Sequence, residues 1–429
     1  MDDGFSHSGT TFRTELKPPA FRSDAFALAL SGGGFRATLF QLGAVEYLLE
    51  VGVLERVTYL STVSGGSILG AKIALHWEEI FRAPVEERPR VFQALVAEPI
   101  KRVAVVDVRN RALRRCLRPR GWGRSRSENL ASVLDEFLYN GARLRELPEV
   151  ERLRIAINAT NLRIGKRFRF SQDSMGEYQL GYGEPGSTSV AFAVAASAAF
   201  PLIFPPLTVH LQNPLVRWSF DSPPKEERRS LPETEMRVDL VDGGLYDNLG
   251  LQAASGRCGH IIAIDASLPL DVEQRNHRTV DGALRSVDVM MSQIVSHSVR
   301  RFVEELLRGT RKGVLIRATQ AVKHIAAVSA SGVQTLDPES VAGVDPIDVS
   351  MLCRIRTDLD SFTQFEADLL RHHGRSLTHA ALRRFQRSWI ARESTAIGFG
   401  AKLSSKERAT LKAGAVRRWS PLFAFWNGS

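Results

Sequence analysis

Residues 25–70 contain two consecutive turns from an apolar strand into a helix, and this repeated unit constrains the fold of the chain most strongly. The first strand, at 25–30, is a short apolar run that ends in the sequence SGGG at 31–34. From Arg36 onward the apolar residues recur with helical spacing. The pattern predicts a strand that passes into a helix through a glycine loop.

The second turn follows at once. Gly52 ends the helix, and the run at 57–63 is β-branched and apolar enough for a buried parallel strand. Ser64, Gly65 and Gly66 then turn the chain sharply into a second helix. Both turns should face the same edge of one sheet, which is where open α/β sheets bind ligands. We therefore predict an α/β fold of three layers, α/β/α, around a mainly parallel central sheet.

Composition narrows the class of protein. With 429 residues, of which 44% are hydrophobic and 24% charged, the chain can bury a full core. It has no run of about 18 apolar residues and no basic region followed by an apolar one near residue 1, so we expect neither a membrane span nor a signal peptide. Cys116, Cys258 and Cys353 lie far apart without metal-ligand spacing. Free thiols in a reducing, cytoplasmic compartment are the simplest interpretation.

The chain is strongly basic, with a net charge of +10 and a pI near 9.8. This balance favours a polyanionic partner, although an arginine-rich coding sequence would produce the same excess. Residues 82–126 hold thirteen Lys or Arg against four Asp or Glu, and the cluster at 109–126 predicts an irregular exposed loop. We expect a basic loop insertion at about 80–126, either as a solvated face or as a contact with an anionic membrane surface.

The rest of the chain continues the α/β pattern. Residues 154–161 and 167–171 alternate like paired strands around a turn at Gly165. Further strands are expected at 238–241, 260–264 and 351–356, and helices at 127–139, 189–199, 284–307 and 362–370.

Ser64 stands where a nucleophile would be expected. A sharp strand-to-helix turn exposes its side chain at the sheet edge and requires small neighbours. A serine hydroxyl needs a base within hydrogen-bond reach and donors that hold an oxyanion. The loop Gly32-Gly33-Gly34 offers backbone N–H groups without side chains, and Arg36 adds positive charge at a helix N-terminus.

The base is harder to find, because none of the ten histidines stands convincingly at a turn of this edge. His260 begins its strand, and His297 falls in a helical stretch. Asp242, in contrast, ends a strand at a glycine turn. A serine or an aspartate in a glycine turn is usually conformational, but their occurrence together with the glycine loop favours a Ser64–Asp242 pair.

Four motifs in this order resemble the patatin-like phospholipases: SGGGFRATLFQLGA, TVSGGS, AASAAFPLIFPP and DGGLYDNLG. The resemblance covers about residues 25–267, and the segment at 356–374 also looks like a later part of such proteins. It implies lipid acyl ester hydrolysis by a Ser-Asp dyad without a metal or other cofactor. Carried over by position, Ser64 is the nucleophile and Asp242 the base. The oxyanion hole falls to Gly32, Gly33, Gly34, Arg36 and Gly65.

The resemblance, the polar segment before Pro18-Pro19 and the helical, basic character of the tail together suggest a domain plan. We predict a flexible N-terminal arm at 1–24, a patatin-like catalytic domain at 25–375, and a helical C-terminal extension at 376–429. Acyl chains would lie against apolar helices near Phe192 and Phe204. The lipid substrate would be met at an anionic membrane surface, by a cytoplasmic protein that is peripheral at that membrane.

One residue departs from the family motif. Thr62 replaces the first glycine of GxSxG, whereas Gly66 retains the second. A β-branched residue should crowd this turn and lower the rate. The neighbouring Ser61 and Ser67 are expected to be structural, through turn hydrogen bonds or helix capping.

Two other classes of function fit parts of the sequence. Gly32, Gly34 and Ala37 fit a GxGxxA dinucleotide fingerprint, but that fingerprint requires an acidic residue at the end of the next strand, which here ends at Val63-Ser64. A non-enzymatic binding protein is the other alternative. No nucleic-acid-binding signature accompanies the basic charge, so its form would be a catalytically weak or silent lipid-binding protein.

Overall fold

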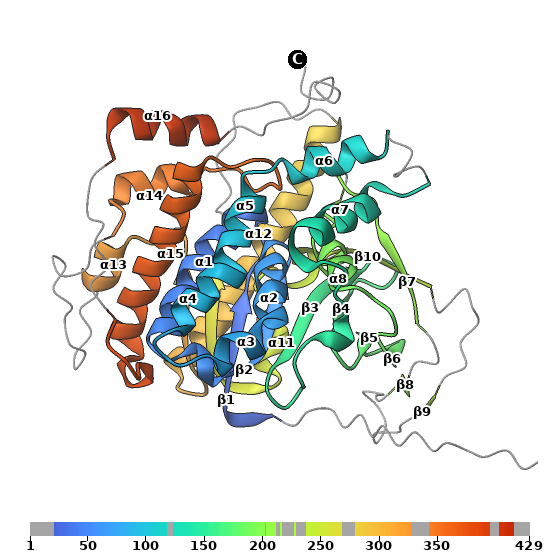
Figure 1. Ribbon diagram of the computed structural model, residues 1–429, viewed down its shortest axis with the longest axis horizontal. Helices are drawn as coiled ribbons and strands as arrows, with labels where there is room; N and C mark the ends of the chain where they lie inside the picture. Colours follow the sequence, from blue (N-terminus) through green and yellow to red (C-terminus); the bar gives the residue numbers. More distant parts are fainter. Residues whose placement is uncertain are drawn as a thin grey trace, which may run out of the picture.

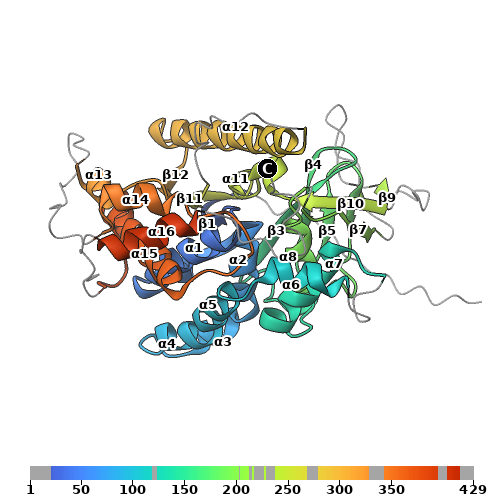
Figure 2. The same ribbon diagram turned by 90° about the horizontal axis from the view of Figure 1, so that it is seen from above.

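The computed structural model describes residues 21–117, 123–201, 203–211, 215–216, 227–228, 237–267, 279–327, 343–394 and 403–415. Within these residues a central sheet is covered by helices on both faces (Figures 1 and 2). The predicted three-layer α/β fold is confirmed. Among the described helices, none has the length and apolar character needed to cross a bilayer.

Five parallel strands form the part of the sheet that carries both glycine turns. Their order is β12 (Lys312–Arg317), β11 (Cys258–Asp265), β1 (Arg22–Leu30), β2 (Val57–Val63) and β3 (Arg154–Asn161). Parallel neighbours need long crossovers, which the helices between these strands supply. The carboxyl ends of β1 and β2 therefore meet at one edge, as predicted.

Beyond β3 the sheet is antiparallel, so the expectation of a mainly parallel sheet holds for the first five strands only. The predicted hairpin is confirmed, because β3 pairs antiparallel with β4 (Lys166–Phe170). Short connections of this kind permit only antiparallel pairing. The sheet continues through β5 (Met175–Glu177), β6 (Gly181–Gly183), β8 (Leu215–Val216) and β9 (Glu227–Arg228).

A separate strand, β10 (Arg237–Asp242), also pairs with β3, and its other partner is β7 (Leu207–His210). β2 pairs with β3 as far as Asn158, and β10 pairs with β3 from Ala159 onward. Asp242 at the end of β10 therefore lies next to the end of β2. This placement joins the glycine turns of 31–66 to a residue far along the chain.

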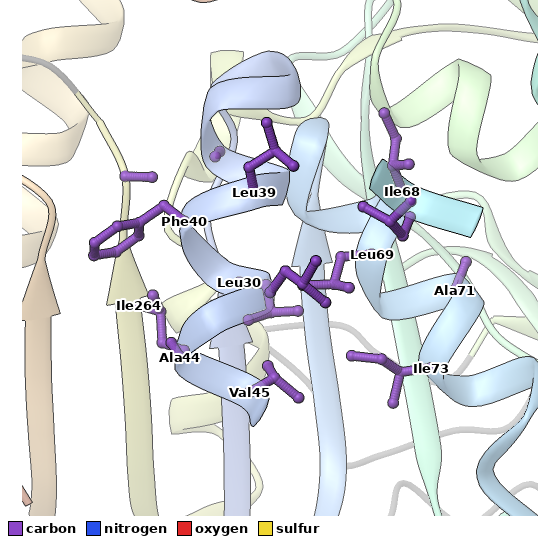
Figure 3. Close-up of a cluster of buried hydrophobic side chains, with 14 of the residues drawn as sticks. Leu30, Leu39, Phe40, Ala44, Val45, Ile68, Leu69, Ala71, Ile73 and Ile264 are labelled. Carbon is purple, nitrogen blue, oxygen red and sulfur yellow. The ribbon is translucent and has the colours of Figure 1, made fainter. Parts of the chain in front are cut away.

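The strand β1 shows how the sequence divides the core into two sides. Its residues Phe26, Leu28 and Leu30 pack into the larger core, and its alanines at 25, 27 and 29 pack into the smaller one. Side chains alternate across a strand, so this sequence covers one face with bulky groups and the other with methyl groups. Figure 3 shows the larger core where α1 and α2 meet the sheet.

The larger core is covered by α1 (Gly34–Glu50), α2 (Gly65–Leu75), α8 (Val190–Ser197) and α15 (Gln364–Phe385). The opposite face is covered by α11 (Leu251–Ser255) and α12 (Thr279–Leu307). The helices predicted at 189–199 and 284–307 correspond to α8 and α12, and the strand predicted at 260–264 lies in β11.

The remaining α-helices are α3 (Trp77–Arg82), α4 (Arg88–Phe92), α5 (Glu98–Ala104), α6 (Val108–Arg115), α7 (Arg126–Leu134), α10 (Gly244–Asp247), α13 (Val322–Ala327), α14 (Pro346–Leu352) and α16 (Ser405–Gly414). Short 3₁₀ or π segments lie at Leu54–Arg56, Gln93–Ala97, Asp135–Tyr139, Leu144–Glu146 and Arg387–Trp389.

The prediction of a basic loop insertion is wrong for the described part of 80–126, which is largely helical. Asp107 caps α6, because its side chain accepts the backbone N–H of Asn110 at 3.0 Å. Val108, Ala112 and Leu113 then bury one side of this helix. The segment is an amphipathic helix with an N-cap, and its many arginines made the sequence resemble an exposed loop. Residues 118–122 lie outside the described part.

Three further predictions need correction. The predicted arm ends too late, because β1 already begins at Arg22, while residues 1–20 lie outside the described part. The predicted strand at 351–356 is wrong, because helix α14 extends to Leu352. The helix start signal at Asp345-Pro346 was outweighed by the alternation of apolar residues that follows it. The domain boundary placed at 375/376 falls inside α15, which packs along α1.

Candidate active site

Ser64 lies on a strained turn between β2 and α2. Its φ of 49° and ψ of −118° are unusual for a residue with a side chain. The next residue must be glycine, since a Cβ at Gly65 would lie 2.2 Å from the carbonyl oxygen of Gly34. The turn at 64–66 therefore lies in close contact with the glycine loop at 32–34, and the Ser64 side chain stands at the sheet edge, as the sequence predicts.

Ser64 and Asp242 are in direct contact. The Ser64 hydroxyl donates to Asp242 Oδ2 at 2.8 Å, and the N–H of Gly244 donates to Oδ1 at 2.7 Å. Both residues are buried, with exposed fractions of 9% and 3%. Burial raises the pKa of Asp242 to about 6, against the opposing effect of these two hydrogen bonds. The pair is a hydroxyl held by a carboxylate of increased basicity.

Ser197 at the end of α8 fixes the backbone of the turn, a contact that the sequence did not predict. Its hydroxyl oxygen accepts the N–H of Ser64 at 2.9 Å and donates to the carbonyl of Asn158 at 2.6 Å. It also lies 2.9 Å from the hydroxyl of Ser67. The only signal for this role was the serine at the centre of the small-residue block AASAAFP.

Thr62 is accommodated rather than crowded. Its hydroxyl accepts from Ser67 at 3.0 Å and donates to the carbonyl of Ala156 at 3.3 Å. Its methyl carbon lies 2.3 Å from where a Cβ at Gly70 would stand, so the missing side chain of Gly70 makes room for it. Ser61 donates to the carbonyl of Gly250 at 2.7 Å, and Ser67 serves this same network, so both have structural partners.

The glycine loop brings backbone donors to Ser64. A Cβ at Gly32 would stand 3.2 Å from the Cβ of Ser64, which shows how close the two loops lie. The N–H of Gly32 donates to the carbonyl of Asn248 at 2.9 Å. In the described part of the chain, no acceptor takes up the N–H groups of Gly33, Gly34 or Gly65. These three donors have no partner among the described residues, and Gly33 and Gly34 line the cavity at this edge.

Arg36 is buried, and its guanidinium is engaged with backbone carbonyls. It donates to Ala266 at 2.7 Å, to Ile355 at 3.3 Å and to Cys353 at 3.4 Å. Burial lowers the pKa of this guanidinium to about 10. Arg36 therefore lies at the cavity wall and connects α1 to the backbone of two distant segments, at Ala266 and at 353–355.

The segment 357–359 backs the glycine loop. The N–H of Phe35 donates to the carbonyl of Asp358 at 3.0 Å, and a Cβ at Gly34 would lie 2.5 Å from that same oxygen. The Asp358 carboxylate forms a buried ion pair with Arg109 of α6, and the N–H of Arg109 donates to the carbonyl of Leu359 at 2.9 Å. No motif in the sequence indicates this pair, whose members stand 249 residues apart.

A cavity of about 280 Å³ opens at these groups, lined by both members of the pair, the glycine loop and Arg36. One part of its wall is apolar, with Phe200, Ile203 and Phe204 beyond α8. α12 supplies another part, through Met291 and Val295. Of the two phenylalanines expected near an acyl chain, Phe204 lines this cavity. Phe192 instead packs against Phe170, with ring centroids 6.3 Å apart.

The histidines that the sequence set aside lie elsewhere. His260 stacks on Phe26, with ring centroids 4.6 Å apart. His373 is buried in α15 with Nε2 at 2.9 Å from the carbonyl oxygen of Ala318. In the ranges that the structure describes, Ser64 bonds to no histidine, and no group of three His, Cys, Asp or Glu side chains could hold a metal ion.

Comparison with known proteins gives one family. A family model described as "Patatin-like phospholipase" matches residues 28–255. No curated protein sequence matches the chain. Among solved structures, human GIVD cytosolic phospholipase A2 is 14% identical, with a TM-score of 0.45 over 91% of this chain and 60% of that one. VipD from Legionella pneumophila is 14% identical, with a TM-score of 0.28 over 62% of this chain and 53% of that one. The chain thus spans little more than half the length of these two proteins.

Proposed function

Since this chain belongs to the patatin-like phospholipase family, we propose that it hydrolyses fatty-acyl ester bonds of phospholipids or related lipids, with Ser64 as nucleophile and Asp242 as base. The observation that carries the proposal is the hydrogen bond of 2.8 Å from the Ser64 hydroxyl to Asp242, in a buried site beside unpaired backbone donors. An ordinary serine is a poor nucleophile, and a carboxylate of raised pKa within reach is what it needs.

The reaction would run in two halves. Asp242 takes the proton of Ser64 as the hydroxyl oxygen attacks the ester carbonyl, and the tetrahedral oxyanion is held by the N–H groups of Gly33, Gly34 and Gly65. The intermediate collapses to acyl-serine, and the leaving alcohol takes the proton from Asp242. Water then gives a proton to Asp242 as its oxygen attacks the acyl-serine. The ester bond to Ser64 breaks, the Ser64 oxygen takes that proton back from Asp242, and the fatty acid is released.

Arg36 takes a supporting role in this proposal. Its guanidinium is occupied by three carbonyls, so it would hold the glycine loop in place rather than contact the oxyanion directly. Each step uses only groups of the protein, and we propose a hydrolase that needs no metal or cofactor. The acyl chain would lie along Phe204 and its apolar neighbours in the cavity.

The test is hydrolysis of a fluorogenic acyl ester and of phospholipid vesicles. Ser64→Ala and Asp242→Asn should each lower kcat by about 10⁴-fold or more, because members of such a unit act together. A chelator should leave wild-type turnover unchanged. The exposed His297 offers a matched control, and His297→Ala should retain full activity.

Three results would count against this proposal. Turnover that survives Ser64→Ala would remove the dyad, and turnover abolished by the chelator would indicate a metal enzyme. A wild-type protein that binds lipid vesicles but turns over neither substrate would instead be the catalytically silent lipid-binding member of the family.

A further inference from the structure

A cluster of arginines lies on the sheet face opposite the larger core, and it begins with the alternation in β4. Phe168 and Phe170 enter the larger core, so Arg167 and Arg169 point to the other face. The register with β3 sets Arg169 opposite Asn158 and Arg167 opposite Thr160. In Figure 2, β4 lies to the right of α11 and α12, the helices that cover this face.

A third arginine reaches the same face from the end of α11. The guanidinium carbon of Arg257 stands 5.3 Å from the centroid of the Tyr59 ring. Tyr59 lies in the core of this face and is paired in register with Arg154 of β3. Burial, together with the like charges of Arg169, Arg154 and Arg167, lowers the pKa of Arg257. Arg257 therefore contacts Tyr59 of β2 and lies within electrostatic range of the arginines of β3 and β4.

The positive charge of this cluster exceeds the negative charge near it. Arg154 is neutralised by Asp173, through two hydrogen bonds of 3.0 and 2.8 Å. Arg169 donates to the hydroxyl of Ser174 at 3.1 Å, and its guanidinium carbon lies 4.8 Å from the centroid of the Tyr182 ring, but neither contact supplies a formal negative charge. Arg167 and Arg257 form no ion pair with any carboxylate in the described residues. The nearby carboxylate of Asp247 already accepts the N–H groups of Leu249 and Gln252.

Four polar atoms of the cluster are buried and lack a hydrogen-bond partner among the described residues. They are Arg167 Nη1, Arg169 Nε, Arg257 Nη1 and the hydroxyl of Tyr59. Arg169 itself is only 6% exposed. Buried donors and charges without partners lower the stability of the folded protein. An acceptor that carries negative charge would remove this loss. Guanidinium groups prefer phosphate and carboxylate oxygens, which accept several N–H donors at once.

We propose that Arg167, Arg169 and Arg257, with the hydroxyl of Tyr59, form a binding site for a phosphate-class oxyanion, separate from the Ser64–Asp242 pair. The anion would accept the four unpaired donors and neutralise the excess charge. Its source is either free phosphate or the phosphate of a lipid headgroup, since both present the same oxygens. The chemistry of the acceptor is the same in the two cases.

Thermal unfolding in a phosphate-free buffer of low ionic strength gives the first test. Arg257→Gln should raise the Tm, because it removes one of several unneutralised like charges. Arg154→Gln, on the same face, should lower the Tm, because it leaves Asp173 unpaired. Inorganic phosphate should then raise the Tm of the wild type in a saturable way, beyond the effect of sodium chloride at equal ionic strength. Its affinity should fall at least about tenfold in Arg257→Gln and in Arg169→Gln.

The second arm distinguishes the sources. If the ligand is a lipid headgroup, Arg257→Gln should bind vesicles of phosphatidylcholine with phosphatidic acid at least several-fold more weakly than the wild type does. Arg308→Gln, an exposed arginine after α12, is the matched control and should bind like the wild type. Saturable binding of either probe that depends on Arg257 supports the site. If neither inorganic phosphate nor these vesicles distinguish Arg257→Gln from wild type, the proposal is overturned.

Discussion

At the scale of single residues, the raised pKa of Asp242 has consequences for the proposed reaction and for stability. Its pKa of about 6 means that the carboxylate is ionised at neutral pH and becomes protonated as the pH falls through 6. A protonated Asp242 cannot accept the proton of Ser64. We therefore predict that kcat/KM for a soluble ester, which reports the pKa values of the free enzyme, falls about tenfold per pH unit below about pH 6. A stopped-flow or steady-state pH profile measures this limb. A flat profile down to pH 4.5 would contradict the assignment of Asp242 as base.

The same raised pKa has a consequence for folding. Asp242 has a pKa near its ordinary value of 3.8 in the unfolded chain and about 6 in the fold. The unfavourable contribution of its buried charge is therefore absent below pH 4 and fully present above pH 6. Asp242→Asn should be more stable than wild type at pH 7, by up to about 3 kcal/mol, and the gain should vanish near pH 4. Urea unfolding at both pH values gives the comparison, and equal stability at pH 7 would contradict the burial argument.

At the scale of elements, the site depends on how α6 and the segment 357–359 support the glycine loop. Asp358 contacts Gly34 through its backbone and Arg109 of α6 through its carboxylate. Arg109 is a positioning residue in this arrangement, since it acts on the loop through Asp358. We predict that Arg109→Met lowers kcat per active site by about 10²-fold for a soluble ester, with KM little changed, because small displacements of catalytic donors are costly.

The measurement must separate positioning from simple loss of structure. Active-site titration counts the competent molecules, and a purely structural role would lower that count and the Tm while kcat per titrated site stayed normal. The double variant Arg109→Met/Asp358→Leu removes both buried charges, and it should regain stability without regaining kcat. Arg371→Met breaks a different, partly buried pair, with Glu46, and serves as control because it lies away from the loop.

The elements also show what could be predicted from the sequence. Glycine turns at strand ends are local, so the positions of Ser64, Asp242 and the glycine loop followed from short motifs and one topological rule. The pairing of β10 with β3 beyond Asn158, which brings Asp242 to Ser64, is a matter of register that no local pattern encodes. Ser197 and Arg109 were missed for the same reason, because their partners are distant in the chain. The helix α6 was missed for a different reason. Its many arginines suggested an exposed loop, although an N-cap residue and an apolar side were also present in the sequence.

At the scale of the whole molecule, one surface combines positive charge with a position close to the cavity, and this is the exposed side of α6. α6 is fixed beside the cavity wall through Arg109 and Asp358, while its residues Arg111 and Arg114 are exposed. Val105 and Leu117, at either side of this helix, are exposed apolar residues, with exposed fractions of 42% and 63%. Cations beside apolar side chains suit an anionic bilayer, which attracts arginine and accepts shallow apolar insertion.

We therefore predict that the protein co-sediments with vesicles that contain phosphatidylglycerol, and less with pure phosphatidylcholine. Each arginine near an anionic surface contributes about 1 kcal/mol, so Arg111→Gln/Arg114→Gln should weaken binding about tenfold or more. Binding should also fall as salt rises from 0.05 to about 0.5 M, because the Debye length shortens to a few ångströms. Hydrolysis of a soluble ester should be far less affected than hydrolysis of vesicles, since these arginines lie outside the cavity lining. If binding resists salt and survives the double substitution, the surface of α6 is not what meets the membrane, and the charge of this segment serves only its solvation.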